Sequence, residues 1–443
     1  TTKFVAEALG KGETEHIPTI IGTSLAFISV LGLIGGAILV IVTPWLVEGI
    51  LNVPPPLIEE TKLVFYISSV SILIALITAS LSGVLEAYQR FDLVNTLRIP
   101  SNILTYIIPA IAIFFGAGLP MIVLLLLVKN FCILIIYFLL LLRVTPSKGS
   151  LFSINFKIAP SLFNFGGWIA LHNAAVAILL YLDRFLVGVF LTMSAVTYYT
   201  APYELVNRSL IIPSSMMMTL FPAFSTLKAM DKEKLQNLFN RALKYLILIM
   251  GLITGIVFVF SKEILLLWLG NEFALKSTIV LQVFAIGVFL SSLAWLSGTV
   301  LQGVGKPKAV TIIHIIQVPI YILSTWLLIR VMGIEGAALS WTMRILLSLV
   351  LLFFACWKAN LFKPILLLQN GSLKLAGMFG LISGITIVFK SFIPFSLMYL
   401  LLIFTVFMIL MLIIILKYGL DRQDRSFIVR TINNLRWRDG YVH

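Results

Sequence analysis

Seven side chains that can carry or share a charge lie within or beside long apolar stretches of this sequence: Lys129, His172, Arg184, Glu204, Arg208, His314 and Arg344. A charge at the bilayer centre costs about 2.5 to 3.5 kcal/mol even on insertion scales, so a charge kept there faces a wet cavity or a partner. Guanidinium groups offer a fork of donors and ammonium groups a point charge, and both suit phosphate and pyrophosphate. The excess of cations predicts a path that accepts negative charge.

Six of these seven residues also have a structural interpretation. Glu204 and Arg208 lie four residues apart and can neutralise one another on one helix face. Lys129 can be neutral when buried, and His172 and His314 can be ordinary packing residues. Arg184 follows Asp183 at a predicted outer helix end, where the two can form a surface ion pair that contributes little.

The elements that must position these residues are predicted to be membrane-spanning helices. Of 443 residues, 60% are hydrophobic and only 11% are charged, whereas soluble domains carry roughly 25% charged residues. Spanning the hydrocarbon core takes about 20 apolar residues per helix. Twelve such stretches are present, near 17–43, 61–83, 99–118, 119–143, 159–182, 195–220, 243–261, 277–302, 309–330, 334–357, 373–390 and 394–417. The sequence therefore predicts an all-α polytopic membrane protein, because a β-barrel would show short alternating strands instead.

The distribution of basic residues predicts the orientation of these spans. Alternate loops on one side hold 23 of the 32 Lys and Arg residues, and those on the other side hold 6. The side rich in cations faces the cytoplasm, which places the C-terminus there. The net charge of +14 therefore follows mainly from topology, and we expect no nucleic-acid binding. The segment 417–443 fits either an amphipathic helix on anionic lipid or a solvated tail.

Two weak internal matches predict a repeated architecture. Residues 81–91 resemble 296–307 at an offset of 215, and residues 2–6 resemble 219–223 at an offset of 217. If both units hold six helices, two helices precede this chain and the intact protein has fourteen. The predicted domains are an N-lobe at 1–145, a C-lobe at 146–360, and a terminal helix pair with a basic tail at 361–443.

Glycine pairs at four-residue spacing predict close helix packing. They are Gly32 with Gly36, Gly251 with Gly255, and Gly380 with Gly384.

Motifs for catalysis or metal binding are not found. Residues 303–306 read Gly-Val-Gly-Lys, but Val300 and Pro307 stand where a phosphate-binding loop needs Gly and Ser or Thr. No metal-ligand cluster, nucleophile elbow or catalytic carboxylate pair is visible, and no outer loop is long enough for a catalytic domain. We therefore expect neither enzyme activity nor a cofactor.

Several stretches resemble the polysaccharide-biosynthesis flippases of the O-antigen (Wzx) type. They are residues 181–188 and 196–203, Phe221-Pro222, residues 81–91, residues 301–307 and residues 333–339. The resemblance covers essentially the entire chain. It implies a two-lobed bundle of the multidrug, oligosaccharidyl-lipid and polysaccharide exporter superfamily, whose first two helices this chain lacks.

The resemblance also implies an activity: transport of a polyprenyl- or dolichyl-linked oligosaccharide across the cytoplasmic membrane by alternating access. Lys129, Arg208 and Arg344 are then candidates for attraction of the head group, with Arg184 as an outer contact. Implied partners are the lipid-linked substrate, membrane lipids and glycan-assembly enzymes, and we expect a monomer. The alternative is a drug or organic-cation antiporter of the same superfamily, which would need acids in its cavity.

Overall fold

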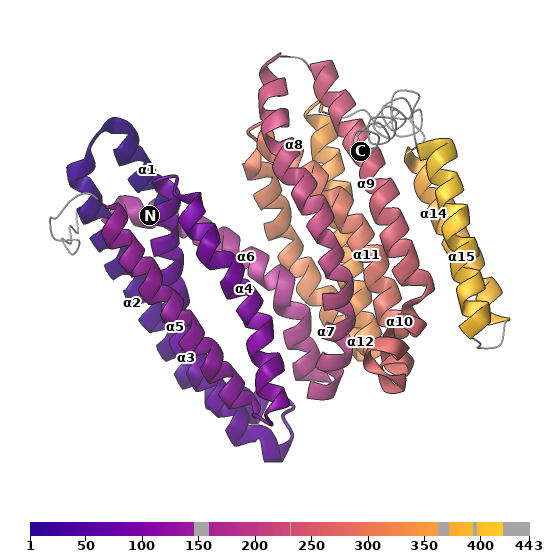
Figure 1. Cartoon of the computed structure of the whole chain (residues 1–443), viewed down its shortest axis with the longest axis horizontal. Coiled ribbons are helices and arrows are strands. Elements are labelled where there is room, and N and C mark those ends of the chain that lie inside the picture. The colour runs from indigo at the N-terminus through magenta and orange to yellow at the C-terminus, as the bar shows by residue number, and fades with distance from the viewer. Residues whose placement is uncertain (146–158, 231, 362–371, 393–396, 420–443) are drawn as a thin grey trace, which may run out of the picture. The chain divides into compact units, whose positions relative to one another are not determined.

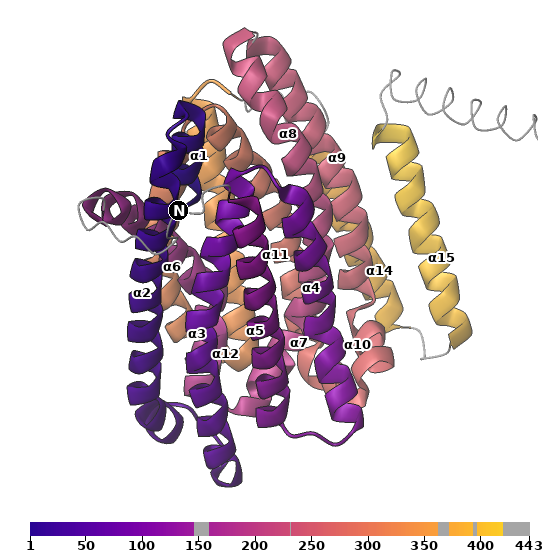
Figure 2. The same cartoon turned by 60° about the vertical axis from the view of Figure 1, so that its left-hand side comes forward.

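The computed structural model of the chain describes residues 1–145, 159–230, 232–361, 372–392 and 397–419, and these residues are almost entirely helical (Figures 1 and 2). Ten stretches among them are long and apolar enough to cross a membrane. The prediction of an all-α polytopic membrane protein is confirmed. The longer helices are α1 (Thr2–Lys11), α2 (Ile17–Trp45), α3 (Ile58–Ala87), α4 (Phe91–Phe114), α5 (Leu119–Val144), α6 (Ala159–Phe190), α7 (Met193–Asn207), α8 (Ile211–Met230), α9 (Lys232–Val259), α10 (Ser261–Leu269), α11 (Asn271–Gly303), α12 (Pro307–Lys358), α14 (Ser372–Ser391) and α15 (Leu397–Ile414).

The chain divides into two compact units, Thr1–Asn173 (unit 1) and Ala174–His443 (unit 2). The division falls within α6, so that this helix contributes residues to each unit. It lies further along the chain than the lobe boundary expected between 145 and 146. The basic tail beyond residue 419 lies outside the described residues.

Unit 1 is a helical bundle in which α3 contacts α1, α2, α4 and α5. Its buried hydrophobic cluster gathers near α1, where Val5, Ile21 and Leu85 are almost fully buried. Away from this cluster the helices expose large apolar side chains, including Ile41 at 75% and Phe114 at 85%. Helices whose backbone is satisfied internally can present such surfaces to lipid.

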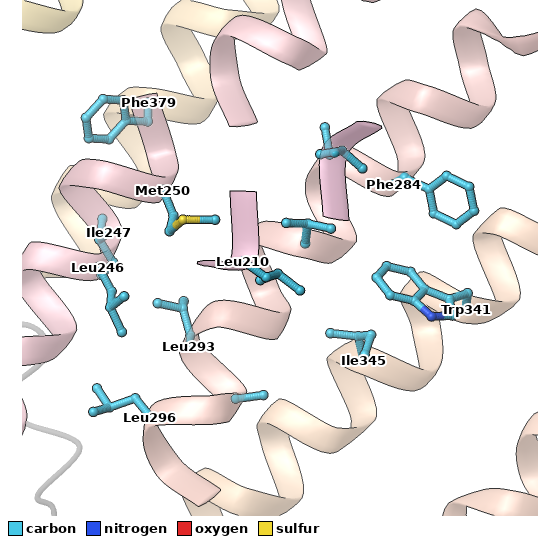
Figure 3. Packing of buried hydrophobic residues seen from close by; sticks show 14 of the residues in the cluster. Leu210, Leu246, Ile247, Met250, Phe284, Leu293, Leu296, Trp341, Ile345 and Phe379 are labelled. Carbon is cyan, nitrogen blue, oxygen red and sulfur yellow. The ribbon is translucent and has the colours of Figure 1, made fainter. Parts of the chain in front are cut away.

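Unit 2 is built around α11, which contacts α7, α8, α9, α10 and α12. Many of its side chains are buried, and Phe284 of α11 packs edge to face on Trp341 of α12, with ring centroids 5.4 Å apart (Figure 3). Aromatic pairs favour this arrangement because a positive ring edge meets a negative ring face. Helix α11 is therefore the central helix of unit 2, and the candidate site is arranged around it.

Helix α12 comprises two spans that were predicted separately, 309–330 and 334–357. Its 52 residues are interrupted at Gly333, whose φ of 59° and ψ of −134° are not helical. The chain reverses there, since the Oγ1 of Thr325 lies 2.8 Å from the Oγ of Ser340. Glycine suits this position because it has no Cβ to clash at positive φ. The reversal brings the two halves of α12 side by side.

The close packing predicted from glycine pairs is confirmed for two of the three. A Cβ on Gly36 would lie 2.9 Å from the carbonyl oxygen of Ser69, and one on Gly251 would lie 3.1 Å from the ring of Phe379. The first contact joins α2 to α3, and the second joins α9 to α14. For Gly380 and Gly384 the prediction is wrong, because no described atom lies within 4 Å of a Cβ there. Both are exposed on α14, where they line a pocket together with residues of α9 and α11.

Candidate functional site

A cavity of about 600 Å³ lies within unit 2, a volume typical of small-molecule sites. Its walls come from α6, α7, α8, α11 and both halves of α12, and Figure 3 shows three of its apolar lining residues, Leu210, Trp341 and Ile345. The polar lining residues are Tyr203, Asn207, Ser214, Ser291, Thr299, Gln302, His314, Arg344 and Ser348. Among the described residues that line the cavity, Arg344 is the only permanently charged one and none is acidic.

Arg344 is positioned by the reversal of α12 at Gly333. Its guanidinium carbon lies 4.9 Å from the ring centroid of Tyr321, on the first half of the helix, and 5.9 Å from that of Trp341. Cations are attracted to the negative faces of aromatic rings. Its Nε is buried and makes no hydrogen bond within the described part of the chain. Arg344 therefore keeps donor capacity for a group inside the cavity.

Asp183 on α6 is only 1% exposed. Its carboxylate accepts a hydrogen bond from the hydroxyl of Tyr199, which is itself fully buried, and another from the backbone N–H of Arg184 at 2.9 Å. The expectation of a surface ion pair between Asp183 and Arg184 is wrong, because Asp183 points into the packed interior of unit 2.

Arg184, Glu204 and Arg208 form one charged group on α6, α7 and the turn that follows α7. Glu204 lies 3.3 Å from Arg184 and 3.6 Å from Arg208, so the expected pairing four residues apart is present and a second cation joins it. Arg184 also lies over the ring of Tyr203, at 4.5 Å from its centroid. The side chains of Glu204 and Arg208 are 47% and 61% exposed. The structure thus brings three of the candidate residues together, beside the cavity wall formed by Tyr203.

The two candidate histidines differ in what the structure describes. His314 lines the cavity from the first half of α12. His172 belongs to α6, but its side chain lies outside the described residues.

Lys129 on α5 is the candidate cation in unit 1. Its ammonium donates to the hydroxyl of Thr105 at 2.8 Å, and the carbonyl oxygen of Ser101 lies 3.4 Å away. Both partners lie on α4. Lys129 therefore joins α4 to α5 through neutral oxygens, and it forms no ion pair with an acid among the described residues of unit 1.

Sequence reasoning missed three buried residues: Asp183 with its hydrogen-bond donor Tyr199, and Tyr321, whose ring faces the guanidinium of Arg344. Asp183 was assigned to an outer helix end because two adjacent charges usually mark the edge of a span. The sequence did contain a signal for this hydrogen bond: Asp183 lies near the end of one apolar stretch, and two tyrosines at 198–199 begin the next. The pairing itself depends on how α6 crosses α7.

The fold and the cavity define a class: a polytopic helical membrane protein whose helices enclose a cavity with one permanent cation among its described lining residues. The structure entitled "Lipid II flippase MurJ, inward closed conformation" matches with a TM-score of 0.71 at 13% identity, covering 93% of this chain and 88% of that one. An inward-facing multidrug resistance MATE transporter of the MOP superfamily matches with a TM-score of 0.67 at 12% identity, covering 81% and 84%. At such identities the likeness concerns the fold alone.

The sequence model of a family described as "Polysaccharide biosynthesis protein" matches residues 19–277, more than half of the chain. The chain belongs to this family, which confirms the resemblance found in the sequence. A relative named "Putative O-antigen transporter", from Shigella flexneri, is 27% identical over 353 residues, 80% of this chain and 83% of its own length. The "Probable low-salt glycan biosynthesis flippase Agl15" of Haloferax volcanii is 26% identical over 199 residues, 44% of this chain and 42% of its own length.

Proposed function

We propose that this protein moves a polyprenyl- or dolichyl-(pyro)phosphate-linked oligosaccharide across the cytoplasmic membrane by alternating access, with its C-terminus in the cytoplasm. The observation that carries the proposal is the unit 2 cavity, where Arg344 is the one permanent charge among the described lining residues. Two relatives are named as an O-antigen transporter and a glycan flippase, which supports the same substrate class.

The cavity has the chemistry that such a head group requires. A phosphorylated sugar head cannot enter hydrocarbon without losing its hydration, at a cost of several kcal/mol per ion even after relaxation. The guanidinium of Arg344 can donate two parallel hydrogen bonds to phosphate oxygens. The amides of Asn207 and Gln302 and the hydroxyls of Ser291 and Thr299 can bond to sugar hydroxyls. The lipid tail remains in the bilayer throughout.

The remaining candidate residues would contact the substrate outside or at the edge of the Arg344 site. We propose Lys129, Arg208 and Arg184 as additional contacts for anionic or sugar groups, with Glu204 holding the two arginines and His314 contributing a neutral donor or acceptor. His172 is retained as a candidate. The substrate and membrane lipids are the proposed partners, glycan-assembly enzymes would supply the substrate, and the protein would act as a monomer without enzymatic activity.

An antiporter for organic cations is the alternative within the same fold. Such a protein needs an accessible carboxylate to attract its substrate. Among the described residues that line the cavity none is acidic, and Asp183 is buried against Tyr199. The likeness to MATE transporters concerns the fold, and the described lining of this cavity offers no carboxylate to an organic cation.

The proposal is tested by complementation of a strain that lacks the chromosomal copy of this gene. Arg344→Gln in the intact protein should reduce surface glycan by about tenfold or more, because a hydrogen bond to a charged group contributes about 1.5 to 3 kcal/mol, and lipid-linked precursor should accumulate. Arg330→Gln is the matched control, since Arg330 lies on the same helix but stacks on Trp326 at 4.2 Å. Membrane protein levels are measured by immunoblot.

Normal glycan export by Arg344→Gln, at normal protein level, would contradict the proposed site. A dye-efflux assay tests the alternative in the same strains. Dye efflux that depends on this protein, with no change in surface glycan on its deletion, would favour the antiporter.

A further inference from the structure

Three aromatic residues line the unit 2 cavity, and they differ in whether a ligand can reach them. They are Tyr203, Trp295 and Trp341. Trp341 is 2% exposed and packs edge to face on Tyr203, with ring centroids 5.5 Å apart, and on Phe284 at 5.4 Å. Tyr203 is 4% exposed, and the guanidinium of Arg184 lies over its ring. The rings of Tyr203 and Trp341 are therefore occupied by packing within the protein.

Trp295 on α11 presents its indole ring to the cavity. It is 43% exposed, although every other residue between 291 and 301 is buried or half-buried. Trp295 also lines the cavity. An aromatic ring that is exposed in a cavity offers a flat apolar surface with a negative face. Among the described aromatic residues of the cavity wall, Trp295 is thus the one that a ligand can contact broadly.

Gly298 keeps space open beside this indole ring. It lies three residues after Trp295 on the same face of α11 and also lines the cavity. No described atom lies within 4 Å of a Cβ built on Gly298, whereas a Cβ on Gly287 of the same helix would lie 2.3 Å from the ring of Trp341. Helix packing among the described residues therefore does not require glycine at 298. The missing side chain instead leaves volume in the cavity next to Trp295.

Polar side chains continue the face of α11 on which Trp295 lies. Ser291 and Thr299 stand four residues before and after it, Gln302 stands seven residues after it, and all three line the cavity. Residues at these spacings share one helix face. A hydrocarbon chain would desolvate these hydroxyls and this amide without replacing their hydrogen bonds, which costs free energy. A sugar ring suits both parts of the wall, because its C–H groups form an apolar face and its hydroxyls project from the rim.

We propose that Trp295 stacks on the apolar face of a pyranose ring of the transported glycan, with Gly298 leaving room for that ring and the polar residues of the same helix face bonding to its hydroxyls. This inference rests on the proposed function and names the residue that recognises the sugar, whereas Arg344 binds the phosphate. The C–H groups of the sugar carry a slight positive charge and are attracted to the negative face of the indole. An axial hydroxyl on that face prevents close contact, so Trp295 also discriminates between sugars.

The test measures binding to the purified full chain in lipid nanodiscs. The probes are farnesyl pyrophosphate alone and farnesyl pyrophosphate capped with glucose, galactose or N-acetylglucosamine. In the wild type at least one cap should raise the affinity by about fivefold, within the range for an aromatic contact. Trp295→Leu should abolish this gain, and Trp295→Phe should keep a gain of at least about twofold. Both variants should bind the uncapped probe as the wild type does.

This pair of variants separates stacking from simple apolar contact, because a wall that binds hydrocarbon would accept leucine. Gly298→Leu should also abolish the gain, since its side chain fills the space beside the indole. Trp268→Leu is the matched control, because Trp268 on α10 is 54% exposed but is not among the described residues that line the cavity. Thermal unfolding of each variant identifies loss of folding, and if Trp295→Leu does not fold, Trp295→Phe and Gly298→Leu decide the outcome.

Equal affinity of the wild type for capped and uncapped probes, or an undiminished sugar-dependent gain in folded Trp295→Leu, would overturn the proposal. So would failure of the wild type to bind any of the probes. Arg344→Gln distinguishes this result from failure of the proposed function, since it should weaken binding of both kinds of probe by the same factor. A gain that needs Trp295, in a protein whose glycan export does not need Arg344, retains the sugar site and rejects the proposed anion site.

Discussion

Asp183 and Arg184 are neighbours in the chain but occupy different environments. Successive residues of an α-helix point about 100° apart, so that one side chain of the pair turns inward to Tyr199 while the other reaches Glu204. Adjacent opposite charges therefore need not pair with each other. The sequence identified Arg184, Glu204 and Arg208 as candidates, but which acid balances which cation depends on residues from other helices.

Gly287 on α11 leaves room for the ring of Trp341 in the cavity wall. A Cβ at Gly287 would lie 2.3 Å from the ring of Trp341 and 2.7 Å from the hydroxyl of Thr342. Gly287→Ala should lower the free energy of unfolding by about 1 to 3 kcal/mol, the usual range for overpacking. The displaced Trp341 ring lines the cavity, so ligand binding should also weaken. Thermal unfolding in detergent micelles measures the first effect.

Gly298→Ala is the control on the same helix, because no described atom lies within 4 Å of a Cβ there. It should unfold within about 0.5 kcal/mol of the wild type. Equal stability of Gly287→Ala and Gly298→Ala would show that Trp341 can move aside at no cost.

Helix α12 has one property that hydropathy predicts and one that it does not. Hydropathy located two spans on either side of residues 331–333, and the structure breaks the helix at Gly333. Hydropathy did not indicate that the two halves would place Tyr321 against Arg344. That contact depends on the sharp reversal, which depends on the conformation of one glycine.

Helix α14 is held to α9 and α10 by a charge pair that no local pattern indicates. Lys390 lies 2.5 Å from Glu263, whose side chain is 6% exposed, and also donates to the carbonyl oxygen of Val259 at 2.8 Å. Glu263→Gln should destabilise the protein by about 3 to 5 kcal/mol, because removing one partner leaves a buried charge uncompensated. The double variant Glu263→Gln with Lys390→Met should recover much of this loss in the same unfolding measurement.

The exposed pair of Glu272 and Lys276, 2.8 Å apart on one helix face, is the control for the variants at Glu263 and Lys390. Glu272→Gln should cost less than about 1 kcal/mol, as exposed ion pairs do. If the losses in unfolding free energy of the two single variants at Glu263 and Lys390 simply add in the double variant, this ion pair does not stabilise the packing of α14.

For the whole molecule, the asymmetry of basic loops predicts which ends of the helices face the cytoplasm. With Cys132 and Cys356 replaced by Ala, single cysteines at Phe115 and Asn271 should react with a membrane-impermeant maleimide added to intact cells. Cysteines at Arg90 and Lys306 should react only after the cells are opened. All four positions are exposed in the structure, so differences in labelling report the side of the membrane.

Labelling of Arg90→Cys and Lys306→Cys from outside, with protection of the other two, would reverse the proposed orientation. A mixed pattern would contradict the assignment of alternate loops to alternate sides. Labelling in detergent is the control that every cysteine is reactive.

From the amino-acid sequence alone it follows that this protein is a helical bundle in a membrane, approximately where its spans lie, and to which family it belongs. These properties follow from hydropathy and charge summed along short segments, which requires no knowledge of distant contacts. Three features depend on how the helices pack: Asp183 is buried against Tyr199, Arg344 faces a cavity, and Lys390 forms an ion pair with Glu263. The physical reason is that a buried charge is stabilised by whichever groups the helix crossings bring within a few ångströms, and those crossings join residues far apart in the chain.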